Sequence, residues 1–298
     1  KAIAALLTNP GEPLDYLEIV GRGRKLTQRS APCIAVPTTA GTGAEATVNA
    51  VLHAADQQVK VSMRSPLMLV ETVIVDPALA LTLPPHVTAC AGLDAVTQLL
   101  EAFVSTGANP LTDALCRQGL VCAGRSLVRA VNDGADLAAR TDMALAALCS
   151  GIALANARLG AVHGLAAPLG GLTGAAHGAL CGRLLPAVTA VNLRALRRHA
   201  PHSPALARYT EAARLFLADA DASTDDFTDA LWRLCRKLHI PTLRELGITD
   251  ETRDAAIPAA RNASSMKTNP IALTDTDLYD CFHDTATTVA SSSGEVAQ

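Results

Sequence analysis

The sequence predicts an α/β portion followed by a domain built only of helices, and two observations predict this division. Before the Pro84-Pro85 pair, short apolar runs end at proline or glycine, which is typical of strands and tight turns. After that pair, apolar residues recur with the 3.6-residue period of helices. Because 49% of the 298 residues are hydrophobic and only 18% are charged, the chain can bury a large core.

The first portion is expected to hold one helix end, two buried strands and a hairpin. Lys1–Leu7 is apolar and precedes an Asn-Pro-Gly turn, so it predicts the end of a helix. Cys33–Val36 and residues 72–76 are apolar runs that stop at proline, and each predicts a short buried strand. Val48–Leu52 and Val59–Met63 flank a polar turn and are expected to pair as a hairpin.

The second portion is expected to hold a series of helices. We expect helices over Asp94–Val104 and Leu111–Val131, and Thr141–Ala157 is apolar nearly all round, which predicts a buried helix. Ser223 and Asp226 have the spacing of a capping box. An apolar stripe follows the box and Pro241 ends it: Phe227, Leu231, Leu234 and Leu238. The last eight residues predict a frayed tail.

Charge and cysteine content limit the partners and the compartment. The net charge of −3 provides no basic field for nucleic acid, so no nucleic-acid partner is expected. The eight cysteines lie singly, without a CxxC pair, which is typical of a reduced, cytoplasmic protein. The longest stretch without a charged residue, 159–182, contains histidines, proline and many glycines, and we expect no membrane span.

A carboxylate and two histidines form a candidate metal site. Asp94 and Gln98 are four residues apart and share one helix face, although Asp94 alone is better explained as an N-terminal helix carboxylate. His163 and His177 lie in a charge-free stretch that Pro168–Gly171 is expected to break into two short helices. One carboxylate and two imidazoles with an open position are typical of a catalytic divalent metal site, while single buried histidines are more often core residues. Both interpretations stay open on these residues alone.

The segment Pro37–Glu45, with the sequence PTTAGTGAE, is a candidate cofactor loop. Its hydroxyls, glycines and backbone N–H groups suit phosphate or ribose oxygens, but an ordinary turn has the same composition. The chain contains no GxGxxG, GxxxxGK[ST] or GxSxG motif, so neither a P-loop nor a serine hydrolase elbow is expected.

Taken together, several stretches resemble the iron-containing (group III) alcohol dehydrogenase family, and they occur in the family's order over essentially the whole chain. They include CIAVPTTAGTGAEAT, VIVDPALALTLPP, GLDAVTQLLEAFVS, HGLAAPLGGLTGAAHG and KTNPIALT. The resemblance implies the dehydroquinate synthase-like fold. In that fold a Rossmann-like nucleotide-binding domain precedes an all-helical metal-binding domain. Residues 1–84 would then be the remainder of the dinucleotide-binding domain, and 85–298 the metal-binding domain.

The resemblance implies a metal-dependent NAD(P) oxidoreductase that interconverts an alcohol with an aldehyde or ketone by hydride transfer. It implies NAD or NADP, a divalent metal (iron or zinc), a small alcohol or aldehyde as substrate, and a homodimer. Implied metal positions are Asp94, Gln98, His163 and His177, of which Asp94, His163 and His177 are also the implied catalytic residues. Implied cofactor positions are Thr38, Thr39, Gly41, Thr42 and Lys60.

The chain departs from the family's pattern at three places. Gln98 stands where iron-dependent members carry histidine, which leaves iron and zinc both open. Ala167 stands where many members carry a second histidine near the nicotinamide. Lys1 resembles the lysine that closes the family's GGGS turn, which implies that the nucleotide-binding portion is incomplete and that this truncated chain binds cofactor poorly.

Two alternatives remain at this stage. A maleylacetate reductase-like or dehydroquinate synthase-like enzyme would act on an anionic substrate and would need cations such as Arg158 and Arg183, which are more simply exposed helix-end charges. A non-catalytic, truncated helical module is the other alternative.

Overall fold

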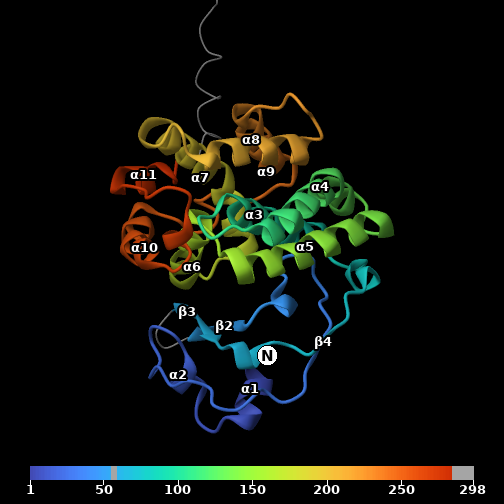
Figure 1. The fold of residues 1–298 in the computed structure, drawn as a ribbon, viewed down its shortest axis with the longest axis vertical. Helices are drawn as coiled ribbons and strands as arrows, with labels where there is room; N and C mark the ends of the chain where they lie inside the picture. Colours follow the sequence, from blue (N-terminus) through green and yellow to red (C-terminus); the bar gives the residue numbers. More distant parts are fainter. Residues whose placement is uncertain (55–58, 284–298) are drawn as a thin grey trace, which may run out of the picture.

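The computed structural model describes residues 1–54 and 59–283 and shows an N-terminal portion beneath a larger helical part (Figure 1). The N-terminal portion contains α1 (Ala2–Thr8), α2 (Pro13–Tyr16), β1 (Ile34–Ala35), β2 (Asn49–Ala54), β3 (Val59–Arg64), β4 (Thr72–Val73) and three short 3-10 helices. The helical part contains α3 (Pro85–Val104), α4 (Pro110–Asn132), α5 (Leu137–Ala157), α6 (Ala161–Thr173), α7 (His177–His199), α8 (Pro204–Leu217), α9 (Thr224–Lys237), α10 (Asp250–Asn262) and α11 (Asp275–Asp280). This order confirms the predicted fold class. The boundary between residues 84 and 85 stays a prediction.

The helix end and the hairpin of the N-terminal portion are confirmed. α1 stops at Thr8, before the Asn-Pro-Gly turn. β2 and β3 pair antiparallel from Asn49 opposite Arg64 to Ala54 opposite Val59. The polar turn of this hairpin lies outside the described residues, and so does the predicted C-terminal tail. A small core joins the helices to β3: Ala5, Tyr16, Leu17, Leu26, Val61, Met63 and Met68.

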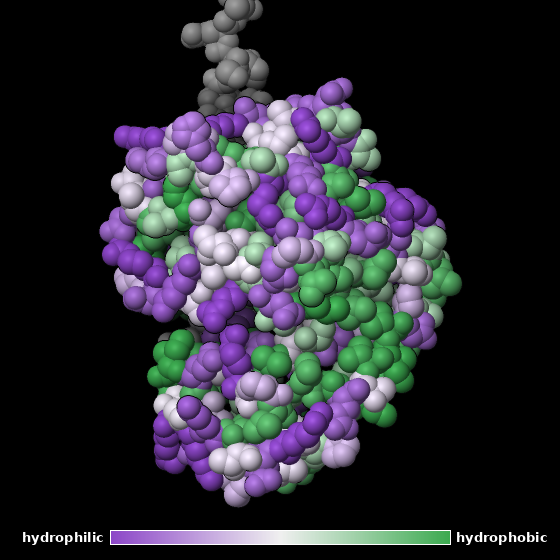
Figure 2. All heavy atoms as spheres, in the orientation of Figure 1, coloured by the Kyte–Doolittle hydropathy of each residue, from purple (hydrophilic) through white to green (hydrophobic). Residues whose placement is uncertain are grey.

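The two other predicted strands are shorter and more exposed than expected. β1 and β4 pair in parallel over only two residue pairs, Ile34 with Thr72 and Ala35 with Val73. Ile34 is 64% exposed and Val36 is 44% exposed, so the prediction that these strands are buried is wrong. Apolar parallel strands are buried when helices or further strands cover both faces, and two residue pairs provide too little sheet for that. Figure 2 shows apolar surface on the side of the molecule where β4 lies.

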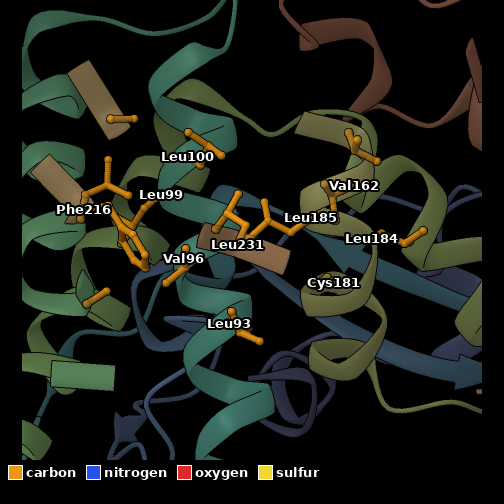
Figure 3. Close-up of a cluster of buried hydrophobic side chains, with 14 of the residues drawn as sticks. Leu93, Val96, Leu99, Leu100, Val162, Cys181, Leu184, Leu185, Phe216 and Leu231 are labelled. Carbon is orange, nitrogen blue, oxygen red and sulfur yellow. The ribbon is translucent and has the colours of Figure 1, made fainter. Parts of the chain in front are cut away.

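α3 is the central helix of the helical part, because α4, α5 and α7 all pack against it. It begins at Pro85, nine residues earlier than predicted, since a proline fits the first position of a helix. Asp94 therefore lies in the middle of α3, and its interpretation as an N-terminal helix carboxylate is wrong. Figure 3 shows the side chains that form the core between α3 and α7: Leu93, Val96, Leu99, Leu100, Leu184 and Leu185.

In the part of the chain that the structure describes, three helices are long and apolar enough to cross a membrane by length and composition alone: α3, α5 and α7. Within the fold, 83% of the apolar stretch of α3 and 89% of that of α7 are buried. Their apolar character therefore matches their place in the helical core.

Other helices follow the local patterns with two corrections. The capping box of Ser223 and Asp226 is confirmed, and the four residues of its stripe are buried. α5 buries one face only, and Leu145 is among its exposed residues, so the prediction of burial all round is wrong. α6 continues through Pro168 and ends at Gly174, whose φ of 72° lies in the left-handed region. The helix break is therefore later than predicted, because a left-handed glycine terminates this helix and the proline does not.

Asp142 joins α5 to α4, and its replacement tests this link. Its carboxylate accepts bonds from the Arg125 guanidinium at 2.6 Å and from the buried Ser126 hydroxyl at 2.5 Å. The Arg125 bond lowers the pKa of Asp142. Asp142→Asn is expected to lower the free energy of unfolding by about 1–2 kcal/mol at pH 7.

A depressed carboxyl pKa contributes stability above its unfolded value, near 4, and the contribution is lost as the pH falls through the folded value. The difference between wild type and Asp142→Asn should therefore shrink below about pH 4. Urea titrations at both pH values measure it, with the exposed Asp229→Asn as control. An equal loss in the control would contradict the link.

Candidate metal centre

Three helices bring one carboxylate and two imidazoles together. Asp94 lies in the middle of α3, His163 in the first turn of α6, and His177 is the first residue of α7. Asp94 Oδ1 lies 3.4 Å from His163 Nε2 and 3.8 Å from His177 Nε2. The two imidazole ring centres are 5.3 Å apart. Residues separated by more than 80 positions thus point their ligand atoms at one place.

Cys181 is a fourth member of this cluster that sequence reasoning missed. Its Sγ lies 3.7 Å from His163 Nε2 and 3.6 Å from His177 Nε2. One donor atom from each of Asp94, His163, His177 and Cys181 lies within 4.8 Å of every other. The sequence holds a sign of it, because Cys181 follows His177 by four residues, which places both on one face of α7.

The cluster contains a buried carboxylate oxygen that makes no hydrogen bond. Asp94 Oδ1 is buried and has no hydrogen-bond partner. Burial works to raise the pKa of Asp94, but the two nearby imidazoles, His163 and His177, outweigh it and hold this pKa below its usual value. The Cys181 sulfur raises the pKa of His177 to about 9 despite burial. A carboxylate oxygen, two imidazoles and a thiol are a donor set that fits a divalent metal.

Glu101 orients one of the imidazoles. Its Oε2 accepts the Nδ1–H of His163 at 2.6 Å, and its Oε1 accepts the backbone N–H of Val162 at 2.6 Å. With the proton on Nδ1, the lone pair of Nε2 faces Asp94. Sequence reasoning gave Glu101 no role, although it follows Asp94 by seven residues and so lies on the same face of α3.

Gln98 lies one helical turn after Asp94 on α3, and its side-chain oxygen faces Ser150, whose hydroxyl also lies 2.8 Å from the carbonyl oxygen of Ala147. The Ser150 hydroxyl lies 2.9 Å from Gln98 Oε1 and 3.3 Å from the carbonyl oxygen of Gly41. Gln98 thus connects α3 through Ser150 of α5 to the loop at Gly41. The metal-ligand role of Gln98 stays a prediction.

The candidate cofactor loop borders an open hollow of about 260 Å³, whose lining includes Lys1, Thr39 and Thr42. Thr38, Thr39 and Thr42 of this loop are exposed, while Gly41 is buried. Lys60 of β3 donates to the carbonyl oxygen of Ala175 at 3.3 Å, two residues before His177. The loop and Lys60 therefore lie beside the helices that carry the metal cluster.

Two glycines of this loop make close contacts with helices. A Cβ on Gly41 would lie 3.1 Å from that of Ala91 on α3. Gly43 has a φ of 56°, and a Cβ there would lie 2.3 Å from the carbonyl oxygen of Ala147 and 2.6 Å from the Cα of Gly151 on α5. The glycines therefore let the loop dock against the helical part, a role that the sequence had not distinguished from ligand contact.

The comparisons with known proteins agree along most of the chain. The pattern described as "Iron-containing alcohol dehydrogenase" matches residues 1–77, and "Fe-containing alcohol dehydrogenase family, C-terminal" matches residues 88–286. Alcohol dehydrogenase 4 of Saccharomyces cerevisiae is 37% identical over 275 residues, which are 92% of this chain and 69% of that protein. The chain belongs to the iron-containing alcohol dehydrogenase family.

Other relatives carry related activities. The 4-hydroxybutyrate dehydrogenase of Cupriavidus necator is 36% identical over 91% of this chain and 70% of its own length. The crystal structure of a 1,3-propanediol oxidoreductase has a TM-score of 0.84 and 33% identity, over 94% of this chain and 72% of its own. The sulfoacetaldehyde reductase of Bifidobacterium kashiwanohense, solved with NAD+, has a TM-score of 0.82 and 28% identity, over 95% and 71% of the two chains.

This iron-containing alcohol dehydrogenase is therefore a metal-dependent oxidoreductase of alcohols and aldehydes, with a small-molecule substrate, a nicotinamide cofactor and a divalent metal. The anionic-substrate and non-catalytic alternatives are not favoured by these relatives. Of the two arginines considered for an anionic substrate, Arg158 is exposed at the end of α5. Arg183 is buried in α7 with its guanidinium over the Trp232 ring, so the interpretation as an exposed helix-end charge is wrong for it.

Gly43→Ala tests the docking of the loop on α5. A side chain at this φ costs about 1–2 kcal/mol, and the overlap with α5 backbone adds about 1–3 kcal/mol. We expect a loss of about 3 kcal/mol in the free energy of unfolding, measured by denaturant titration. Gly23→Ala is the matched control, because its φ is 68° and nothing lies within 4 Å of its Cβ position. Equal losses in the two variants would mean that docking contributes nothing.

Proposed function

We propose that Asp94, His163 and His177 hold the catalytic divalent metal of an enzyme that interconverts a small primary alcohol and its aldehyde with NAD. One observation carries this proposal. The buried Asp94 Oδ1 has no hydrogen-bond partner, yet it faces the Nε2 atoms of two histidines at 3.4 and 3.8 Å. An unbonded buried carboxylate oxygen is costly unless a cation completes it.

Each residue has a separate task in this proposal. Asp94 contributes negative charge from the centre of α3, and Glu101 keeps the His163 proton on Nδ1 so that Nε2 is free to bind. His177 is 40% exposed and marks the side from which a substrate enters. When bound, a divalent metal acts as a Lewis acid that polarises the C–O bond of the substrate. The buried, charge-poor surroundings strengthen that electrostatic effect.

The cofactor assignment rests on the loop and on one relative. We assign Thr38, Thr39, Gly41 and Thr42 to cofactor contact because Thr39 and Thr42 line the open hollow, and Thr38 and Gly41 belong to the same loop, which Gly41 docks on α3. Lys60 adds an ammonium group that reaches the turn before His177. NAD is proposed over NADP because a relative of the same fold was solved with NAD+.

The proposal also includes a cytoplasmic location and a homodimeric assembly. All eight cysteines are free thiols, and most of them are buried, which favours the reducing cytoplasm. A homodimer stays a prediction from the family resemblance.

Metal analysis beside an activity assay tests the proposed function. We expect about one metal per chain in the full-length protein, and oxidation of NADH with short aldehydes. Asp94→Ala should lose both. Gln98→His is the informative second variant. It should tighten binding if a side chain at position 98 reaches the metal, and leave binding unchanged if it does not. Protein that binds no divalent metal under any condition would refute the proposal.

A further inference from the structure

Cys181 lies where a metal ligand would lie, and neither the family pattern nor the relatives assign it. Among residues 1–54 and 59–283, its cluster with Asp94, His163 and His177 is the one group of three or more His, Cys, Asp or Glu donors that could share a metal. A cysteine alone proves nothing. The independent observation is the buried Asp94 Oδ1, which lies in the same cluster without a hydrogen-bond partner.

The separations between donor atoms match a tetrahedral site. Zinc binds sulfur at about 2.3 Å and imidazole nitrogen or carboxylate oxygen at about 2.1 Å, so tetrahedral angles place sulfur about 3.6 Å from nitrogen and oxygen about 3.4 Å from nitrogen. The Sγ of Cys181 lies 3.7 and 3.6 Å from the two Nε2 atoms. Asp94 Oδ1 lies 3.4 and 3.8 Å from the same atoms. Three of these four separations lie within about 0.1 Å of the tetrahedral values, the fourth is about 0.4 Å longer, and every donor atom lies within 4.8 Å of the others.

Close packing of α7 on α3 positions the sulfur. A Cβ at Gly178 would lie 2.5 Å from the carbonyl oxygen of Cys90, and a Cβ at Gly182 would lie 2.8 Å from Leu93 Cδ1. These two glycines lie one turn apart and flank Cys181 on α7. They bring the backbone of α7 so close to α3 that the short Cys181 side chain reaches the Asp94 carboxylate.

Gln98 is the competing candidate for the fourth position, and its contacts point elsewhere. Its Oε1 faces the Ser150 hydroxyl oxygen at 2.9 Å, and that hydroxyl also lies 2.8 Å from the carbonyl oxygen of Ala147. An amide oxygen is also a poorer ligand for zinc than a thiolate, because soft sulfur ligands select zinc over harder divalent ions.

We propose that the Cys181 thiolate is a fourth protein ligand of the metal, in place of Gln98, and that it makes this site prefer zinc to iron. The inference rests on the proposed function, since Asp94, His163 and His177 must hold the same ion. On binding, the S–H bond breaks, the sulfur–metal bond forms, and the proton passes to solvent. The site stays accessible from the exposed edge of His177.

Cobalt(II) substitution tests the sulfur bond directly, because a cysteine thiolate on cobalt gives a near-ultraviolet charge-transfer absorption. The full chain loaded with cobalt(II) should show this absorption. Cys181→Ser should lose it, should still bind cobalt, and should bind zinc at least about 10-fold more weakly. Cys90→Ser is the matched control, because Cys90 lies on α3, one turn before Asp94 and outside the cluster, and it should behave as wild type.

The outcomes separate this inference from the proposed function. Cobalt binding by wild type without the sulfur absorption would overturn the role of Cys181, even if Cys181→Ser did not fold. Equal zinc affinity in wild type and Cys181→Ser would also overturn it. In both cases loss of binding in Asp94→Ala would still support the three-ligand centre. Binding that survives in Asp94→Ala would instead refute the proposed function.

Discussion

Asp94→Asn is expected to abolish metal binding and to lower kcat/KM by about 1,000-fold, which corresponds to about 4 kcal/mol of transition-state stabilisation. Asparagine keeps the shape of the side chain in the middle of α3 but removes the charge that balances a divalent ion. Replacing a residue that only orients a metal ligand lowers metal affinity by about 10–100-fold. Removing the carboxylate ligand itself should therefore lower metal affinity by more than about 100-fold.

Equilibrium dialysis with zinc and elemental analysis measure the effect on binding. Circular dichroism should show an unchanged helix content, because Asn fits the same space. Asp142→Asn is the control, since it changes another aspartate of the helical part that does not belong to the cluster. It should keep its metal. An Asp94→Asn protein that holds one metal per chain as tightly as wild type would remove Asp94 from the site.

The residues of the candidate metal centre that the sequence predicted and those that it missed were marked by different kinds of signal. Asp94, His163 and His177 were found because charged or ionisable residues are rare in their apolar surroundings, and a family resemblance marked the same positions. Cys181 and Glu101 have the right helical spacing from His177 and Asp94. Spacing gives the face of a helix but does not say which other helix that face meets. The close packing of α7 on α3 brings Cys181 to Asp94, and this packing is a tertiary contact that residue spacing does not predict.

The fold was predictable where short-range patterns determine it. The capping box of Ser223, the hairpin of β2 and β3, and the long helices follow from neighbouring residues. The predicted burial of β1 and β4 was wrong. An apolar run shows that a strand favours burial, but other elements must pack on its faces to bury it. The end of α6 was misplaced because Pro168 is a weaker terminator here than the left-handed backbone of Gly174.

Glu101→Gln is expected to weaken zinc binding by about 10–100-fold although it leaves all metal ligands in place. Glu101 accepts two hydrogen bonds, from His163 Nδ1–H and from the Val162 N–H, and a glutamine has only one oxygen. If the amide oxygen faces His163, the amide N–H₂ opposes the Val162 N–H. If the amide N–H₂ faces His163, it favours the tautomer with the proton on Nε2, which blocks the binding atom.

Either orientation of the introduced amide therefore disturbs the His163 imidazole. Because glutamine has almost the same size as glutamate, weaker zinc binding would indicate that Glu101 orients His163 and does not only pack against it. Activity at limiting zinc should fall with affinity and recover at high zinc, because the ligands remain. Glu211→Gln is the control, since that glutamate pairs with Arg117 at the surface between α8 and α4. It should bind zinc as wild type does. If Glu101→Gln also keeps wild-type affinity, the tautomer of His163 is set by something other than Glu101. If its activity stays low at saturating zinc, Glu101 acts beyond orienting His163.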